Sequence, residues 1–193
     1  MTTFKALESS KTDNGNKLSI VEKSIDDLPE GDILVKVNYS SLNYKDALSA
    51  SGAPGVTRNY PHTPGIDAAG VIAESNNSSF KEGDSVIVTG YDLGMDTAGG
   101  FGEYIRVPAS WVIQLPKGLS ESDSMALGTA GLTAGLSVQA LNDHNSNEGF
   151  EGLNTVVTGA TGGVGSIAVM LLSKLDASVT AVTGKDAQKE LLQ

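Results

Sequence analysis

The strongest constraint on the fold lies near the end of the 193-residue chain, where a Gly-x-x-Gly-x-x-Gly turn occupies residues 159–165. The β-branched segment 154–158 precedes the turn, the apolar segment 167–174 follows it, and residues 178–183 form a second β-branched segment. Strand, turn, helix and strand in this order predict a parallel βαβ unit, in which glycines let backbone N–H groups approach a pyrophosphate at the helix N-terminus. Three glycines alone would also suit a plain strand-to-helix turn, but the flanking segments favour a dinucleotide-binding turn.

The end of the second β-branched segment indicates which dinucleotide would bind. An Asp or Glu there would accept hydrogen bonds from the adenosine ribose hydroxyls of NAD, whereas this segment ends in Thr183-Gly184-Lys185. A hydroxyl, a small residue and a cation suit a 2′-phosphate, so the sequence favours NADPH over NADH. Two alternatives stay open, because Asp186 could face the ribose and Lys185 could be an ordinary solvated lysine.

The first 116 residues differ from the remainder, since they contain all six prolines of the chain. Proline marks turns and edge strands, so two kinds of architecture are expected. Alternating apolar and polar residues between Gly and Pro turns predict short antiparallel strands in a barrel-like domain. The expected strands are residues 18–23, 33–39, 67–73, 84–89 and 103–107.

A helix is expected between these two regions. Ser120 and Asp123 have the spacing of an N-terminal cap, with Asp in place of the usual Glu or Gln, and residues 126–141 are rich in small side chains. Each of the three glycines in this segment costs a helix about 1 kcal/mol relative to Ala, which indicates close packing against another element or a ligand. Thr133 is a candidate cofactor contact, although a merely tightly packed helix fits equally well.

These patterns predict an α/β plus β organisation in two domains. Residues 1–124 would form the β-rich domain, and residues 125–193 the N-terminal part of a Rossmann domain, a doubly wound parallel sheet. Two parallel strands cannot bury their faces, because three or more are generally required. We therefore expect a chain that stops inside an incomplete nucleotide-binding domain, as a fragment of a longer protein.

A second group of chemically useful side chains, Asn43-Tyr44-Lys45-Asp46, follows the strand expected at residues 33–39. A phenol and an amide can donate hydrogen bonds to an oxygen that gains negative charge. Asn43 and Tyr44 are accordingly the candidate catalytic residues. In an equally good alternative, Tyr44 packs against a strand end while Lys45 and Asp46 form a solvated pair.

Composition argues against several classes of function. The chain has no Cys and only two His, which rules out a disulfide scaffold, thiolate chemistry, Cys-ligated zinc and a His-rich metal site. One of these, His62, is interpreted as a plain surface or turn residue in a proline-bracketed loop. The net charge of −10 disfavours nucleic acid and anionic membranes as partners. Without a visible signal peptide or an apolar run near the roughly 20 residues that span a bilayer, a cytoplasmic location is expected.

Five motifs occur together in a familiar order. They are Ser41-Leu-Asn-Tyr-Lys-Asp-Ala-Leu48, Pro64-Gly-Ile-Asp-Ala-Ala-Gly70, Gly99-Gly-Phe-Gly-Glu-Tyr104, Gly128-Thr-Ala-Gly-Leu-Thr-Ala134 and Val157-Thr-Gly-Ala-Thr-Gly-Gly-Val-Gly165. As a set they resemble the zinc-free quinone oxidoreductase branch of the medium-chain dehydrogenase/reductases, and in particular the NADPH-dependent acrylyl-CoA reductase subgroup. The resemblance covers essentially the whole chain, and the motifs are specific jointly rather than singly.

The resemblance implies a GroES-like catalytic domain followed by a Rossmann domain that continues past residue 193, with the active site in the cleft between them. Zinc-dependent relatives carry Gly-His-Glu where this chain has Gly65-Ile66-Asp67, so no metal is expected. The cofactor contacts that it implies are Tyr44 for NADP, Thr161, Gly162, Gly163 and Val164 for the phosphates, and Thr183, Gly184 and Lys185 for the 2′-phosphate.

The implied function is the NADPH-dependent reduction of an activated carbon–carbon double bond without zinc, with acryloyl-CoA to propionyl-CoA as the leading reaction. Asn43 and Tyr44 would then donate hydrogen bonds to the enolate oxygen or to the nicotinamide ribose. One alternative is NADPH:quinone reduction, and another is a truncated, non-catalytic fragment of such an enzyme. A homodimer is expected for the full-length form.

Overall fold

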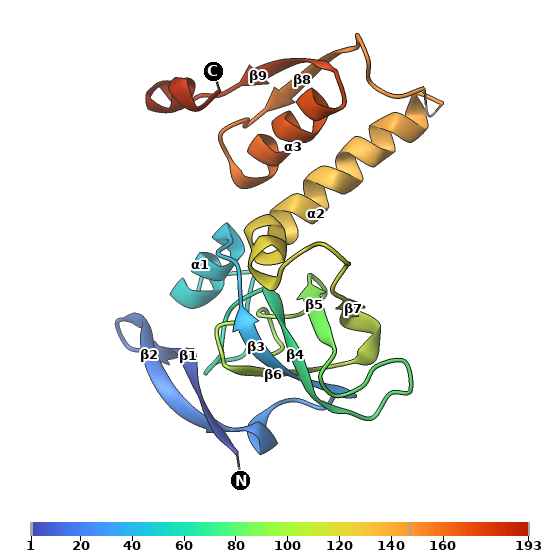
Figure 1. The fold of residues 1–193 in the computed structure, drawn as a ribbon. Helices are drawn as coiled ribbons and strands as arrows, with labels where there is room; N and C mark the ends of the chain where they lie inside the picture. Colours follow the sequence, from blue (N-terminus) through green and yellow to red (C-terminus); the bar gives the residue numbers. More distant parts are fainter. Residues whose placement is uncertain (1, 147, 193) are drawn as a thin grey trace. The chain divides into compact units, whose positions relative to one another are not determined.

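The computed structural model describes residues 2–146 and 148–192, and the chain divides into two compact units, residues 1–128 and 129–193 (Figure 1). The division falls at Gly128, inside the long helix α2 (Glu121–His144). The sequence analysis placed the domain boundary at residue 124, shortly before this point. Each unit is described by itself.

Unit 1 is built on an antiparallel five-stranded sheet with the order β6-β3-β4-β5-β7. Its strands are β3 (Ile33–Tyr39), β4 (Asp67–Ser75), β5 (Ser85–Thr89), β6 (Tyr104–Val107) and β7 (Val112–Gln114). A separate hairpin is formed by β1 (Thr3–Thr12) and β2 (Gly15–Ser24). All five expected strands are confirmed, whereas β1 and β7 were not predicted.

The core of unit 1 consists of branched aliphatic side chains that alternate along these strands. Ile33 and Val35 of β3 pack with residues of β4, β5, β6 and β7 in one cluster, and each is at most 1% exposed. Burying such a side chain contributes roughly 1.5–3 kcal/mol to folding. The period-2 pattern that predicted the strands is therefore the pattern that fills this core.

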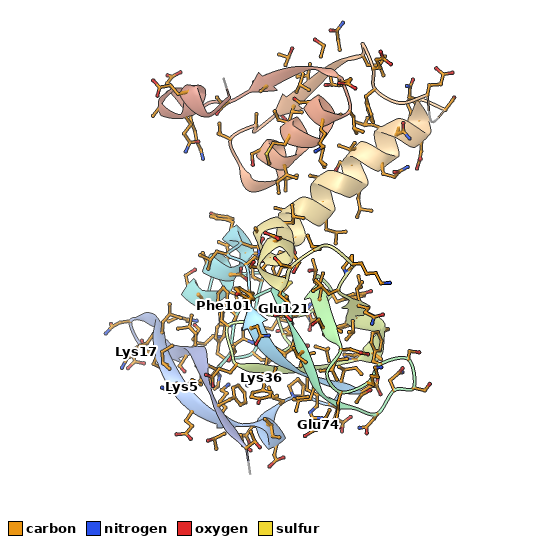
Figure 2. The ribbon with its side chains drawn as sticks, in the orientation of Figure 1. Lys5, Lys17, Lys36, Glu74, Phe101 and Glu121 are labelled. Atoms are coloured by element: carbon orange, nitrogen blue, oxygen red, sulfur yellow. The ribbon has the colours of Figure 1, made fainter. Side chains whose placement is uncertain are left out.

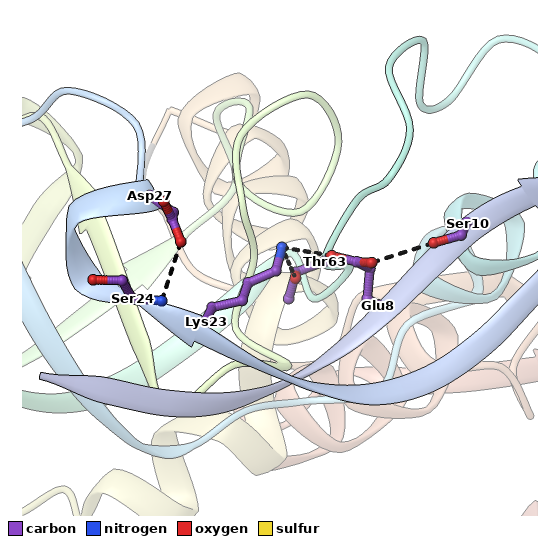
Figure 3. Close-up of polar contacts among 6 residues, drawn as sticks. All are labelled: Glu8, Ser10, Lys23, Ser24, Asp27 and Thr63. Atoms are coloured by element: carbon purple, nitrogen blue, oxygen red, sulfur yellow. Dashed lines mark hydrogen bonds and ion pairs between the residues drawn. The ribbon is translucent and has the colours of Figure 1, made fainter.

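The hairpin β1–β2 is attached to the loops of unit 1 by backbone and side-chain contacts. Ser9 and His62 exchange two backbone hydrogen bonds of 2.8 and 2.9 Å, and the Leu7 N–H donates to the Phe101 carbonyl at 2.9 Å. Phe101 is labelled in Figure 2. Lys23 Nζ lies 2.9 Å from Glu8 Oε2 and donates to Thr63 Oγ1 at 3.5 Å (Figure 3). The loop that carries His62 and Thr63 is thereby attached to the hairpin.

Unit 1 also contains the short helix α1 (Tyr44–Ser51), two single-turn 3₁₀ helices, η1 (Ile25–Asp27) and η2 (Ala109–Trp111), and the first turns of α2. The expected cap of α2 is present, because the Asp123 N–H donates to Ser120 Oγ at 3.0 Å. The Asp123 side chain accepts a hydrogen bond from the Ser120 hydroxyl at 2.6 Å.

The helix α2 is interrupted at Gly128, which corrects the expectation of an unbroken helix over residues 126–141. Gly128 has φ 51° and ψ −153°, a conformation that side-chain-bearing residues rarely adopt. A Cβ atom at this position would lie 2.7 Å from both Asp67 Oδ2 and Ser41 Oγ. Gly is therefore required at position 128, because the backbone there passes close to polar side-chain atoms. This is the close packing that the glycine content of the segment indicated.

Unit 2 contains the predicted βαβ unit. The strands β8 (Asn154–Thr158) and β9 (Ser178–Val182) pair in parallel, and α3 (Gly163–Lys174) connects them. The small core of unit 2 consists of Val138 of α2, Phe150 from the segment before β8, and Leu172 of α3. Val157 of β8 packs against it. The 3₁₀ helix η3 (Asp186–Leu192) follows β9 and starts at the residue expected to cap a helix. None of the helices in the described ranges has the length and apolar character needed to cross a membrane.

Gly128 and Gly135 of α2 have different surroundings and give opposite predictions for substitution by Ala. Gly128→Ala should destabilise the protein, by about 1–3 kcal/mol for the backbone conformation alone. Gly135→Ala should stabilise it by about 1 kcal/mol, because Gly135 is helical and an added Cβ meets nothing within 4 Å. The measurement is thermal unfolding of both variants beside the wild type. A Gly128→Ala variant as stable as Gly135→Ala contradicts the role given to Gly128.

Candidate active site

In unit 2 the glycine-rich turn leads directly into the N-terminus of α3. Within the turn, the Gly162 N–H donates to the Gly159 carbonyl at 2.8 Å. A Cβ at Gly165 would collide with that same Gly159 carbonyl oxygen, so the turn can close only with Gly at this position. Gly162 caps α3 without a side-chain hydrogen bond. The N–H groups of the first helical turn, from Gly163 onward, are therefore available to an anion.

The residues expected at a 2′-phosphate lie beside this turn. Thr161 Oγ1 of the turn and Thr183 Oγ1 after β9 are 3.0 Å apart and share a hydrogen bond. The Lys185 N–H donates to Thr183 Oγ1 at 3.1 Å, and Gly184 and Lys185 are exposed. The structure thus brings together predicted residues that are separated by more than twenty positions in the chain.

A groove of about 740 Å³ runs along β8 and the glycine-rich turn. It is lined by residues 154–159 and 162–165, and by side chains of α2 and α3 that include Ser137 and Ala168. Thr133 is not among the lining residues. Its hydroxyl donates to the Thr129 carbonyl at 2.8 Å, one turn back along the helix. A cofactor contact by Thr133 stays a prediction.

In unit 1 the candidate catalytic residues lie at the start of α1. Tyr44, the first residue of the helix, is 81% exposed, so it does not pack against a strand end. Asp46 is 2% exposed and accepts hydrogen bonds from the Asn43 N–H at 2.7 Å and the Ile66 N–H at 2.9 Å. The alternative of a solvated Lys45–Asp46 pair is therefore wrong.

Asn43 is held by a second buried carboxylate that the sequence analysis did not include in the site. Asp67, at the start of β4, is fully buried, and its Oδ2 accepts a hydrogen bond from Asn43 Nδ2 at 2.8 Å. The Ser41 hydroxyl donates to the same oxygen. The only sequence signal for this contact is the placement of Asp67 in a run of small, apolar residues, where an acidic side chain needs partners.

Burial raises the pKa of the Asp46 carboxyl above its ordinary value, and the nearby charge of Asp67 raises it further. The backbone N–H groups of Asn43 and Ile66 act in the opposite direction, since they stabilise the ionised form. Asn43 consequently lies between two acidic residues. Asp46 accepts from its backbone N–H and also contacts its side chain in the capping box of α1, and Asp67 accepts from its side-chain amide.

His62 is buried, which corrects its interpretation as a surface residue. It is 5% exposed, its ring packs edge-on against Tyr60 at a centroid distance of 6.4 Å, and its Nε2 has no hydrogen-bond partner among the described residues. Burial lowers the pKa of His62, because the surrounding protein disfavours the charged ring. Over residues 2–146 and 148–192, no three His, Cys, Asp or Glu side chains form a group that could hold a metal ion.

Comparison with known proteins first defines the class. The alcohol dehydrogenase GroES-like domain family matches residues 29–117, within unit 1. A GroES-like domain followed by a glycine-turned parallel βαβ unit is the arrangement of the medium-chain dehydrogenase/reductases, and the chain belongs to this superfamily.

Within the superfamily, the chain is similar to a small group of enzymes. It is 43% identical over 192 residues to "Putative quinone oxidoreductase YhfP" of Bacillus subtilis, covering 100% of this chain and 58% of YhfP. It is 42% identical over 191 residues to the acrylyl-CoA reductase AcuI of Ruegeria pomeroyi, covering 98% of this chain and 57% of AcuI. The crystal structure of the yhdH oxidoreductase from Salmonella enterica in complex with NADP matches with a TM-score of 0.92 and 42% identity, over 97% of this chain and 57% of that one. The chain thus spans less than two thirds of the length of these relatives.

The buried His62 predicts a pH-dependent stability. The native state holds His62 neutral, whereas the unfolded chain takes up a proton near the ordinary pKa of 6.5, so stability should fall as the pH falls below that value. The measurement is the urea midpoint between about pH 7.5 and pH 5.5. His62→Gln should lose part of this dependence, and the exposed His144→Gln should keep it. Identical pH profiles for the wild type and His62→Gln contradict the prediction.

Proposed function

We propose that this chain forms the GroES-like domain and the first part of the cofactor domain of an oxidoreductase that uses NADPH to reduce the activated carbon–carbon double bond of an enoyl-CoA, without zinc. Acryloyl-CoA is the leading substrate. The observation that carries the proposal is the uncapped N-terminus of α3 beside the Thr161–Thr183 pair, in a chain 42% identical to an acrylyl-CoA reductase. The expected homodimer and cytoplasmic location stay predictions.

The residues of unit 2 fit a phosphorylated dinucleotide. Thr161, Gly162, Gly163 and Val164 would hold the phosphates, and Thr183, Gly184 and Lys185 the 2′-phosphate. Whichever of Thr161 and Thr183 donates to the other, the pair keeps one hydroxyl hydrogen to donate to a phosphate oxygen. Structures of relatives that contain NADP or NADPH support this cofactor, and a structure of yhfP that contains NAD supports a nicotinamide dinucleotide more generally.

Bound NADPH supplies two electrons as a hydride equivalent to the β-carbon of the substrate. Negative charge then builds on the thioester oxygen, and the chain must stabilise it. Tyr44, which is 81% exposed and next to the fixed Asn43, presents a phenol that can donate to this oxygen and can also contact the cofactor. Because the chain has no Cys to ligate zinc, hydrogen-bond donors take the part that a Lewis acid plays in zinc enzymes.

Quinone reduction is the second candidate, and the 43% identity to YhfP favours it. The two candidates differ in the acceptor. Turnover with acryloyl-CoA but not with benzoquinone or naphthoquinone supports the first, and turnover with the quinones alone supports the second. Because the chain spans 57% of AcuI, the assay uses this chain both alone and joined to the remaining residues of AcuI. Turnover by the chain alone would exclude the alternative that the chain is a non-catalytic fragment.

Cofactor preference can be measured without turnover. NADPH should bind more tightly than NADH in a titration followed by nucleotide fluorescence, and Lys185→Ala should reduce the preference by about tenfold, because it removes a charge-assisted contact to the 2′-phosphate. Lys174→Ala, which removes an exposed lysine from the last turn of α3, is the matched control and should change neither affinity. Equal binding of NADPH and NADH would contradict the contact between Lys185 and the 2′-phosphate. It would favour the alternative in which Asp186 contacts the adenosine ribose.

The donor role of Tyr44 predicts a loss of turnover. Tyr44→Phe should slow acryloyl-CoA reduction by at least about tenfold, since removing one such donor typically costs about 3–4 kcal/mol in barrier. Tyr39→Phe is the control, because Tyr39 is a half-exposed tyrosine at the end of β3. Initial rates are measured in the fusion with AcuI residues, and a Tyr44→Phe rate equal to that of Tyr39→Phe would exclude the donor role.

A further inference from the structure

We propose that Asn14, at the tip of the hairpin β1–β2, is a site of spontaneous chemical modification, where the side-chain amide is converted to a carboxylate. The backbone nitrogen of Gly15 attacks Cγ of Asn14, a C–N bond forms, and ammonia leaves, which gives a cyclic succinimide. Water then opens the ring at either of its carbonyl groups, and the products are aspartate and isoaspartate. Each ammonia released is balanced by one water consumed, and no enzyme or oxidant takes part.

The fold itself calls for this pair of residues. Thr12 pairs with Gly15 in an uninterrupted antiparallel register, so Asp13-Asn14 is the whole turn between the strands. Gly15 has φ +100°, a backbone conformation that L side chains rarely adopt, and Asn is among the residues that turns favour. Because Gly15 has no Cβ, no side chain hinders closure of the ring. The chain contains no other Asn-Gly pair.

The side chain of Asn14 is open to the reaction. Asn14 and Gly15 are both exposed, and a Cβ placed on Gly15 would meet nothing within 4 Å. Within residues 2–146 and 148–192, the hydrogen bond of Asn14 to a side chain comes from its backbone N–H, which donates to Thr12 Oγ1 at 3.3 Å, and no group holds its amide. Asn16 differs, because its Nδ2 donates to Ser9 Oγ at 2.8 Å and Lys17 follows it.

The attacking nitrogen belongs to the last pair of the hairpin. The N–H of Ser9 donates away from β2, to the His62 carbonyl, and donors alternate in direction along a strand. Thr12, three residues later, therefore faces β2, and the Gly15 N–H is directed at the Thr12 carbonyl. Terminal pairs of this kind open at low cost in free energy while the remainder of the structure stays folded. We expect the reaction to proceed from this opened tip.

Isoaspartate at position 14 would change the backbone as well as the charge, because its main chain runs through the side-chain carboxyl and gains one methylene. The turn positions Asn16, which contacts the end of α1. Asn16 Nδ2 donates to Ser9 Oγ, and the Ser9 hydroxyl donates to the Ala50 carbonyl at 2.7 Å. A Cβ on Gly52, the C-cap of α1, would lie 2.5 Å from Asn16 Oδ1. The isoaspartate product should therefore loosen the C-terminal end of α1.

Peptide mapping of the folded chain tests the site. After incubation in mildly alkaline buffer, trypsin releases residues 12–17 as one peptide that contains both Asn14 and Asn16. Fragment masses should locate the replacement of NH₂ by OH at Asn14, at a rate at least about tenfold above that at Asn16, or about 1.4 kcal/mol in activation free energy. A sample digested without incubation corrects for conversion during digestion. No conversion of Asn14, or conversion no faster than that of Asn16, overturns the proposal.

The same incubation in urea separates a property of the native chain from one of the unfolded chain. The native chain should react more slowly than the unfolded one, because the tip must first open, but it should react. Conversion in urea alone would show that the hairpin protects Asn14, and it too overturns the proposal. Asn14→Gln should abolish the reaction under both conditions, since a glutamine would have to close a larger ring.

The effect on α1 is tested by comparing two forms with the same charge. Asn14→Asp carries the new carboxylate on an ordinary main chain and is the matched control for the isoaspartate form, which is separated from the incubated protein by chromatography. The isoaspartate form should unfold at a lower urea concentration than the wild type. Asn14→Asp should unfold near the wild-type midpoint, because position 14 is exposed. Equal midpoints for the two forms contradict the loosening of α1.

Discussion

The buried carboxylate of Asp67 is the constraint on which the candidate site of unit 1 depends. A charged group without solvent contact must be surrounded by donors, and the nearest ones, Ser41 and Asn43, come from the loop after β3. The same carboxylate excludes a side chain at Gly128. One acidic residue at the start of a strand therefore determines residue choice at two segments far from it in the sequence, and with them the position of Tyr44.

Unit 2 depends on a different kind of constraint, the close approach of two backbone segments. Gly165 lies against the Gly159 carbonyl, so the first turn of α3 packs closely on the residue that follows β8, and the N-terminus of α3 has no side-chain cap. The Thr161–Thr183 hydrogen bond then joins this turn to the end of β9. Backbone geometry creates the proposed anion site here, and side chains would determine which dinucleotide fits it.

The parts of the structure that the sequence predicted well are those in which neighbours along the chain decide the outcome. Alternation identified β2 to β6, and β-branched segments around a glycine turn identified the βαβ unit. What was missed depends on contacts between distant residues. The burial of His62 follows from its pairing with Ser9 of the hairpin, and Asp46 is buried because the Ile66 N–H supplies a partner. The interruption of α2 at Gly128 follows from Asp67, and no local pattern distinguishes it from a helical glycine such as Gly135.

The acidity of the chain, a net charge of −10, does not oppose binding of a polyanionic cofactor or CoA ester in the way it opposes binding of nucleic acid. A nucleic acid is bound through many lysines and arginines spread over a surface, so its affinity follows the overall charge. A pyrophosphate at a helix N-terminus is bound through a few N–H groups at hydrogen-bond distance, together with the positive end of the helix dipole, and salt screens charges farther away than about 10 Å. In the proposed function, such a local site is supplied by the uncapped α3, the free hydroxyl hydrogen of the Thr161–Thr183 pair and Lys185. Local donors rather than net charge would therefore decide which anions this protein can bind.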